Sequence, residues 1–202
     1  MAISVWAYAE TRVDKIWRRS TDMVPNPEYY CSEEQCPGEE PCPSPSMIPQ
    51  SVEVGDSRIY AAILINERHA WSKDPIAPIV PERGFPKDAC AEVAAVYVSM
   101  GRDAEHASWL TLREILEFEW DGRTIVREAI VSKEDALKFG PNQTGLPEGV
   151  RSYSEASRDG SRVTWTETYR EAFGLEHLSN IIQELSRYGA PEDVRLILWC
   201  DR

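Results

Sequence analysis

Val194-Arg-Leu-Ile-Leu-Trp-Cys200 is the stretch of this sequence that decides the fold. Arg195 is its one charged residue, and the other side chains are apolar. A run of this kind, beginning soon after the helix-ending Gly189-Ala-Pro191, is typical of a strand that is covered on both faces. We therefore expect residues 194–200 to form a central strand of a sheet.

The N-terminal residues predict the neighbours of this strand. Apolar side chains along residues 2–11 fall on both faces of an extended segment, with Ile3, Val5, Ala7 and Ala9 on one face and Trp6 and Tyr8 on the other. A turn at Asp14-Lys15, followed by residues 16–18, is the pattern of a hairpin. We therefore expect an N-terminal hairpin in the same sheet.

Helical patterns fill most of the chain between these strands. Thr111-Leu-Arg-Glu114 is a capping box, in which the hydroxyl and the carboxylate bind free amides of the first turn, and it predicts a helix to about residue 119. Residues 103–109 are interpreted as a polar turn that leads to this cap. Other elements are expected as a strand over 123–131 and as helices over 56–66, 88–101, 132–139 and 164–188, the last with a break at Gly174.

These elements predict an α+β fold. We expect one domain over residues 1–202, in which a small mixed sheet, made of the N-terminal hairpin and the C-terminal strand, packs with several helices. A chain of 202 residues is long enough to bury a core without help from disulfides or metals.

Residues 20–55 are predicted to be a long loop or insertion, because prolines recur through them and no helical or strand period fits. Cys31, Cys36 and Cys42 lie in this segment. Their spacings are loose for a closed zinc site, and no fourth Cys or His follows nearby. We interpret them as unpaired thiols, with bound zinc as the alternative, and we expect no other cofactor.

The charge balance restricts the partners. Lys and Arg number 22 and Asp and Glu 34, which gives a formal net charge of −12. Such a surface repels phosphate, so we expect neither direct nucleic-acid binding nor binding to an anionic membrane. It suits a protein partner with a basic surface, and solubility alone is the alternative explanation. The N-terminus has no secretory pattern, so we expect a cytoplasmic protein with reduced thiols.

One cluster has residues suited to acid–base chemistry. His106 lies between Asp103 and Glu105 on one side and Ser108 on the other. An imidazole with nearby carboxylates can polarise a water molecule. This set is the candidate catalytic site if the chain is an enzyme, and the polar turn before the Thr111 cap is the other interpretation.

A second set has residues suited to holding an anionic small molecule. Arg58 and Arg83 are the candidate anion contacts, and Tyr60 or Trp109 is the candidate stacking platform. Surface salt bridges are the alternative explanation for both arginines.

Several segments resemble an uncharacterised family of phage-encoded and bacterial proteins that begin Met-x-Cys-Asp-Ile-His-x-Tyr-Val-Glu-x-Arg. In the opening segment, Met1, Tyr8, Glu10 and Arg12 fit that register. Four further segments are similar to blocks of the family: Arg58-Ile-Tyr60, Glu82-Arg-Gly-Phe-Pro86, Asp103 to Glu114 and Pro191 to Asp201. The resemblance covers most of the chain outside the Cys-rich segment.

The chain departs from this family where the family carries potential metal ligands. The family's Cys, Asp and His near the start and its His-x-His pair in the middle form a set that could bind a transition metal. Those positions here hold Ile3, Ser4 and Trp6, followed by Glu105 and Ala107. A divergent member without the set is expected to bind rather than to catalyse.

The leading hypothesis is therefore a non-catalytic phage or prophage accessory protein that binds and inhibits a host protein, as an anti-defence, anti-CRISPR-like inhibitor in the host cytosol. One alternative is a hydrolase that acts on a nucleotide or other small substrate through His106, Asp103 and Glu105. Another is a sponge that sequesters a signalling nucleotide through Arg58, Tyr60, Arg83 and Trp109.

Overall fold

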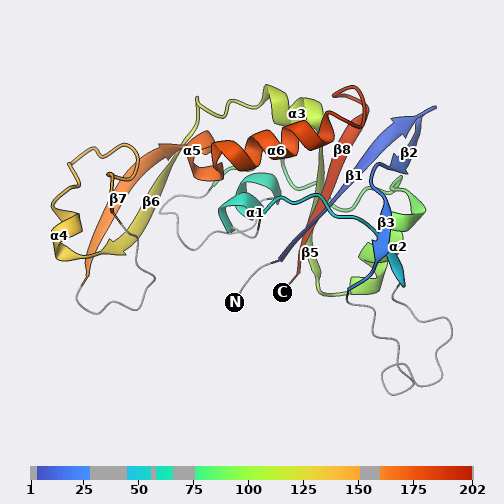
Figure 1. Cartoon of the computed structure of the whole chain (residues 1–202), viewed down its shortest axis with the longest axis horizontal. Helices are drawn as coiled ribbons and strands as arrows, with labels where there is room; N and C mark the ends of the chain where they lie inside the picture. The colour runs from blue at the N-terminus through green and yellow to red at the C-terminus, as the bar shows by residue number, and fades with distance from the viewer. Residues whose placement is uncertain (1–3, 28–44, 56–57, 66–75, 151–159, 202) are drawn as a thin grey trace, which may run out of the picture.

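The computed structural model describes residues 4–27, 45–55, 58–65, 76–150 and 160–201 (Figure 1). Its elements are, in chain order, β1 (Ser4–Val13), β2 (Ile16–Arg19), β3 (Met23–Pro25), β4 (Met47–Pro49), α1 (Arg58–Ile65), α2 (Ala91–Met100), β5 (Ala104–Thr111), α3 (Leu112–Glu117), β6 (Thr124–Val131), α4 (Lys133–Ala136), β7 (Ser161–Thr168), α5 (Tyr169–Phe173), α6 (Leu175–Leu185) and β8 (Val194–Asp201). The predicted α+β class is confirmed. Within the described ranges, no helix has the length and apolar character needed to cross a bilayer.

The main sheet has four antiparallel strands in the order β2-β1-β8-β5. Residues 194–200 of β8 are all buried, so the prediction of a central strand is correct. The hairpin of β1 and β2 is also as predicted. Its turn residues Asp14 and Lys15 both have positive φ, at 51° and 66°, the backbone of a two-residue type I′ turn.

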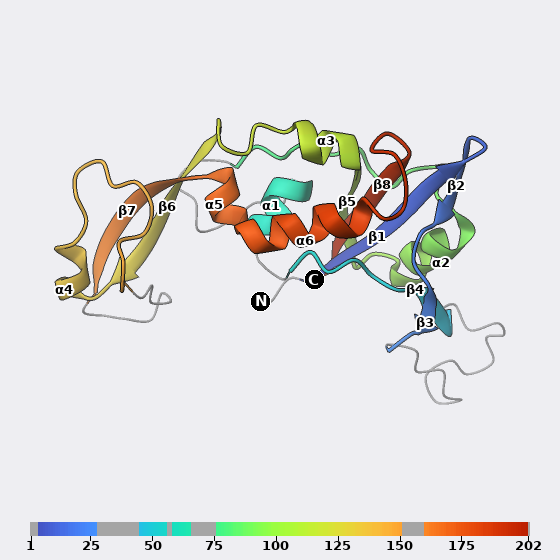
Figure 2. The same ribbon diagram turned by 45° about the horizontal axis from the view of Figure 1, so that its top comes forward.

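Helices cover both faces of this sheet, which explains why β8 is apolar throughout (Figures 1 and 2). On one face, Ala7 and Ala9 of β1 and Leu196 and Leu198 of β8 share a core with buried residues of α1, α3, α5 and α6. On the other face, Tyr8, Ile197 and Trp199 pack with Val93 and Val96 of α2.

The strands β6 and β7 form a separate two-stranded sheet. We call β6, β7, α4 and residues 137–150 the arm. Figure 1 shows it extending away from the four-stranded sheet, with α4 at the far end. Four of its buried residues form a small cluster of their own, made of Val131, Val150, Val163 and Trp165, while Ile125 of β6 joins the core of the main sheet. The arm therefore has a core distinct from those of the main sheet.

Two expected loops contain strands. Residues 104–111 form β5 rather than a polar turn, because Ala107, Ser108 and Leu110 are buried against the sheet. Within residues 20–55, β3 and β4 pair as a short antiparallel ladder. Cys31, Cys36 and Cys42 lie outside the described residues.

The helix predicted over residues 164–188 begins five residues later than expected. Residues 161–168 form β7, in which buried Val163 and Trp165 alternate with exposed Thr164. Thr168 ends the strand and caps α5 through a capping box with Glu171. The predicted break at Gly174, which has a φ of 84°, separates α5 from α6.

Candidate functional site

A β-bulge in β5 sets the direction of the His106 side chain. The register with β8 shifts between Glu105, opposite Cys200, and Ser108, opposite Leu198. His106 lies within this irregularity and has a φ of 54°, a backbone conformation that residues other than glycine adopt at an energetic cost. Bulges of this kind re-aim a side chain, and here the imidazole Nδ1 lies 3.6 Å from Oε2 of Glu82.

The predicted catalytic residues lie at the start of β5, with Asp103 directly before the strand and Glu105 and His106 within it. Asp103 is exposed and borders a pocket beside the C-terminal end of α2, and the described lining of that pocket includes neither Glu105 nor His106. Ser108 is fully buried and accepts a hydrogen bond from the backbone N–H of Arg83. The partner of His106 is thus Glu82, a residue that the sequence pattern did not single out.

Arg83 is the centre of an ordered group beside β5. Its guanidinium donates to both carboxylate oxygens of Glu114 and lies 4.5 Å from the centre of the Trp109 ring. Glu114 also closes the capping box with Thr111, as predicted. Burial acts to raise the pKa of Glu114, but the hydrogen bonds and charge of Arg83 and the bonds from Thr111 outweigh it and lower the pKa. Arg83 therefore has the salt bridge that was the alternative to an anion site.

The other members of the predicted anion site lie elsewhere. Tyr60 packs against the core on the α6 face. The centre of its ring lies 4.6 Å from that of Phe173 and 5.3 Å from that of His177. Trp109 packs on the opposite, α2 face of the sheet. Arg58 is the first residue of α1, and its side chain lies outside the described part of the structure. The two candidate stacking platforms thus serve different cores.

A buried charge network on the α2 face is absent from the sequence-based predictions. Arg195 and Glu10 form an ion pair with a shortest distance of 2.7 Å, and their side chains are 1% and 0% exposed. Arg195 also donates to Asp88, whose side chain is 67% exposed, and its guanidinium lies 4.0 Å from the centre of the Trp17 ring. The sequence did carry a signal for this network. Glu10 and Arg195 are oppositely charged residues in two apolar segments that were both predicted to be strands.

The network fixes the ionisation of its neighbours. Burial acts to raise the pKa of Asp88, but the hydrogen bond and the charge of Arg195 outweigh it, and the pKa is lowered. Glu10 also accepts a 2.7 Å hydrogen bond from the backbone N–H of Cys90. Burial, helped by the Glu10 carboxylate, raises the pKa of the Cys90 thiol to about 12, so this thiol is not a nucleophile near neutral pH.

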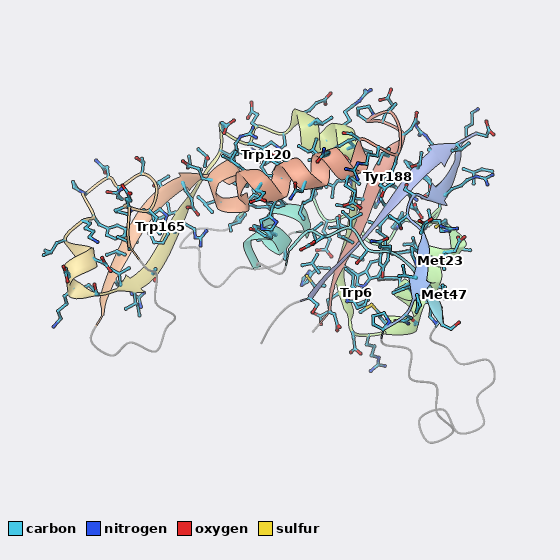
Figure 3. All side chains as sticks on the ribbon, in the orientation of Figure 1. Trp6, Met23, Met47, Trp120, Trp165 and Tyr188 are labelled. Atoms are coloured by element: carbon cyan, nitrogen blue, oxygen red, sulfur yellow. The ribbon has the colours of Figure 1, made fainter. Side chains whose placement is uncertain are left out.

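The pocket bordered by Asp103 lies where β1 begins and where α2 and β8 end. Its volume is about 250 Å³, and Trp6, Met100 and Asp201 contribute to its walls. Figure 3 labels Trp6 at this end of the sheet and Trp165 on the arm. The Trp6 Nε1–H is buried and has no hydrogen-bond acceptor among the described residues. No group of three potential ligands among His, Cys, Asp and Glu lies in the described ranges in a position to hold a metal ion.

This end of the sheet also brings together Ser4, Trp6 and Glu105, which come from two different strands. Ser4 of β1 pairs with Asp201 of β8, and Trp6 pairs with Trp199. Glu105 of β5 pairs with Cys200 on the other side of β8. Residues of β1 and β5, about a hundred positions apart in the sequence, therefore lie on either side of β8. Searches against protein-family models, curated proteins and solved structures find no match to this chain.

Proposed function

We propose that this chain is a non-catalytic accessory protein of phage or prophage origin that binds and inhibits a host protein in the host cytosol. The partner has a basic surface, and a component of an antiviral defence system fits the resemblance to phage-encoded proteins. The arm is the observation that carries this proposal.

The arm has the features of a contact element. It extends from the main sheet, and it has a small core of its own. The Leu137 side chain, which follows α4 at the far end, is 87% exposed, and Leu146 is 42% exposed. A leucine this exposed adds almost nothing to the stability of the free chain, whereas burial in a partner would contribute about 1.5–3 kcal/mol.

The charge of the chain supports a basic partner. A net charge of −12 speeds association with a positively charged surface and disfavours acidic competitors. Asp103 and Asp201 add local support, because neither forms an ion pair with another described residue.

Affinity capture from host cells tests the proposal with a matched pair of variants. Leu137→Asp should lose the partner that the wild-type chain captures. Leu175→Asp changes a leucine that is 62% exposed at the start of α6, so it should keep the partner. The captured protein should then lose its activity when the purified chain is added. Capture by all three chains alike, or capture without inhibition, would contradict the proposal.

The His106 bulge favours one second candidate, a hydrolase that uses His106 together with Glu82. Strained backbone of this kind is often found at functional sites. His106→Ala should abolish hydrolysis of a panel of nucleotides, and Glu82→Gln should reduce it. An absence of hydrolysis by the wild-type chain, or unchanged hydrolysis by His106→Ala, would remove this candidate.

A further inference from the structure

The pocket at the end of the main sheet is lined by acidic and other polar residues and by several apolar side chains. Trp6, Ile48, Val96 and Met100 supply apolar surface, and Asp103 and Asp201 supply carboxylates. Its volume of about 250 Å³ falls below the roughly 300–1,000 Å³ of sites that hold drug-sized molecules. It is therefore suited to one long side chain rather than to a nucleotide.

Three independent features make this pocket attractive to a cation. Neither Asp103 nor Asp201 is paired with a cationic side chain in the described ranges. The C-terminal end of α2, which carries partial negative charge, contributes Ser99 and Met100, and its last turn has no basic residue. The lining also includes the indole of Trp6, an aromatic group of the kind that attracts cations.

These features together favour a guanidinium over an ammonium group. A planar guanidinium can stack on an indole while its fork of N–H groups donates to two carboxylates. An ammonium is a compact and strongly hydrated charge, and it gains less from stacking. The apolar side chains of the lining can also contact the methylene stem of an arginine.

We propose that this pocket receives an arginine side chain from the protein partner. The inference rests on the proposed function for the owner of that arginine, whereas the chemistry of the pocket can be tested without the partner. It adds a second contact, on the main sheet rather than on the arm, and it names the group that a basic partner must present there.

Titration of the intact chain with acetyl-Gly-Arg-Gly-amide tests the pocket directly. The peptide should shift the Trp6 indole N–H resonance, identified by its loss in Trp6→Phe, and should leave that of Trp165 on the arm unmoved. The citrulline peptide keeps the shape of arginine without its charge, so it should bind about tenfold more weakly or not at all. Binding of the arginine peptide should also weaken as salt is raised.

A charge-matched pair of double variants locates the binding. Asp103→Asn/Asp201→Asn should weaken binding of the arginine peptide about tenfold or more. Glu134→Gln/Glu148→Gln removes the same charge from exposed positions on the arm and should leave binding unchanged. Far-UV circular dichroism and thermal unfolding establish that both double variants are folded.

Several outcomes would overturn the inference. These are equal binding of the arginine and citrulline peptides, no shift of the Trp6 resonance, or equal losses in the two double variants. Peptide binding at the pocket together with failed capture from host cells would reject the proposed function and leave the pocket assignment standing. Capture without peptide binding would reject the pocket assignment and leave the proposed function standing.

Discussion

The four-stranded sheet and the arm contain the same motif in two environments. In the sheet, Arg195 pairs with Glu10 of the neighbouring strand and lies 4.0 Å from the centre of the Trp17 ring. In the arm, Arg127 pairs with Glu167 of the neighbouring strand and lies 5.8 Å from the centre of the Trp165 ring.

What differs between the two motifs is access to water. The paired side chains in the sheet are 1% and 0% exposed, whereas those in the arm are 24% and 12% exposed. A fully buried charge left alone is very costly, whereas a part-buried one keeps some contact with water. Losing one partner should therefore cost more in the sheet than in the arm.

The largest expected effect comes from removing one partner of the buried pair. Arg195→Met should lower the free energy of unfolding by about 3–5 kcal/mol, because Glu10 would be left as an uncompensated buried charge. Arg127→Met should cost less, because the Glu167 side chain, which is 12% exposed, keeps some contact with water. Urea denaturation of both variants measures the difference.

The double variant Glu10→Gln/Arg195→Met is the control for this prediction. It removes both charges and should be more stable than Arg195→Met alone. Equal losses in the two arginine variants would show that burial does not separate the sheet from the arm.

Capping boxes give the second comparison, because a strand runs directly into a helix in both regions. Thr111 caps α3 at the end of β5, and Thr168 caps α5 at the end of β7. Each change to alanine should cost about 1 kcal/mol of unfolding free energy. The cost should be larger at Thr111, because Arg83 also holds Glu114. Thermal unfolding measures both, and a larger loss for Thr168→Ala would contradict the role given to Arg83.

The third prediction concerns how the free energy of unfolding depends on pH. Arg83 and Thr111 lower the folded-state pKa of Glu114 below its usual value of 4.5, against the effect of burial. Such a group stabilises the fold above its unfolded pKa, and the contribution is lost as the pH falls through the folded pKa. In Glu114→Gln the free energy of unfolding should therefore fall less steeply below about pH 4.5 than in the wild type.

Urea denaturation between pH 7 and pH 3 measures this dependence. Glu117→Gln is the matched control, because Glu117 lies on the same helix, is exposed and forms no ion pair with a described residue. Identical pH profiles for Glu114→Gln and the wild type would contradict the prediction.

The smallest expected effect is at the end of the arm. Leu137→Asp should change the free energy of unfolding by less than about 0.5 kcal/mol, because the leucine is 87% exposed. Chemical denaturation checks this value before the variant is used in capture experiments. A loss of several kcal/mol would mean that Leu137 is packed in solution, and its use as a contact residue would fail.

Hydrophobic periodicity and capping residues correctly predicted the elements that have a signal in their own consecutive residues. The hairpin of β1 and β2, the apolar strand β8 and the helix after Thr111 all lie where the sequence placed them. Residues 164–168 were predicted to begin a helix, yet they belong to β7, where the buried residues Val163 and Trp165 are two positions apart, the spacing of a strand. The β-branched and aromatic residues there favour a strand once β6 is available as a partner.

The contacts of the candidate site residues could not be predicted from the sequence, because they depend on which residues meet in the fold. Asp103 and His106 are three residues apart in the sequence, yet the bulge in β5 points the imidazole at Glu82 while Asp103 borders a different pocket. Tyr60 and Trp109 were grouped as stacking platforms, and the sheet separates them.

The sequence by itself determined the α+β class, the central position of β8 and the excess of acid, because apolar period and charge are properties of consecutive residues. Only the tertiary structure decided that Glu10 meets Arg195 and that Trp6 shares a pocket with Asp103 and Asp201. The physical reason is strand order. Placing β8 between β1 and β5 brings together residues that are far apart in the chain, and no local pattern encodes that pairing.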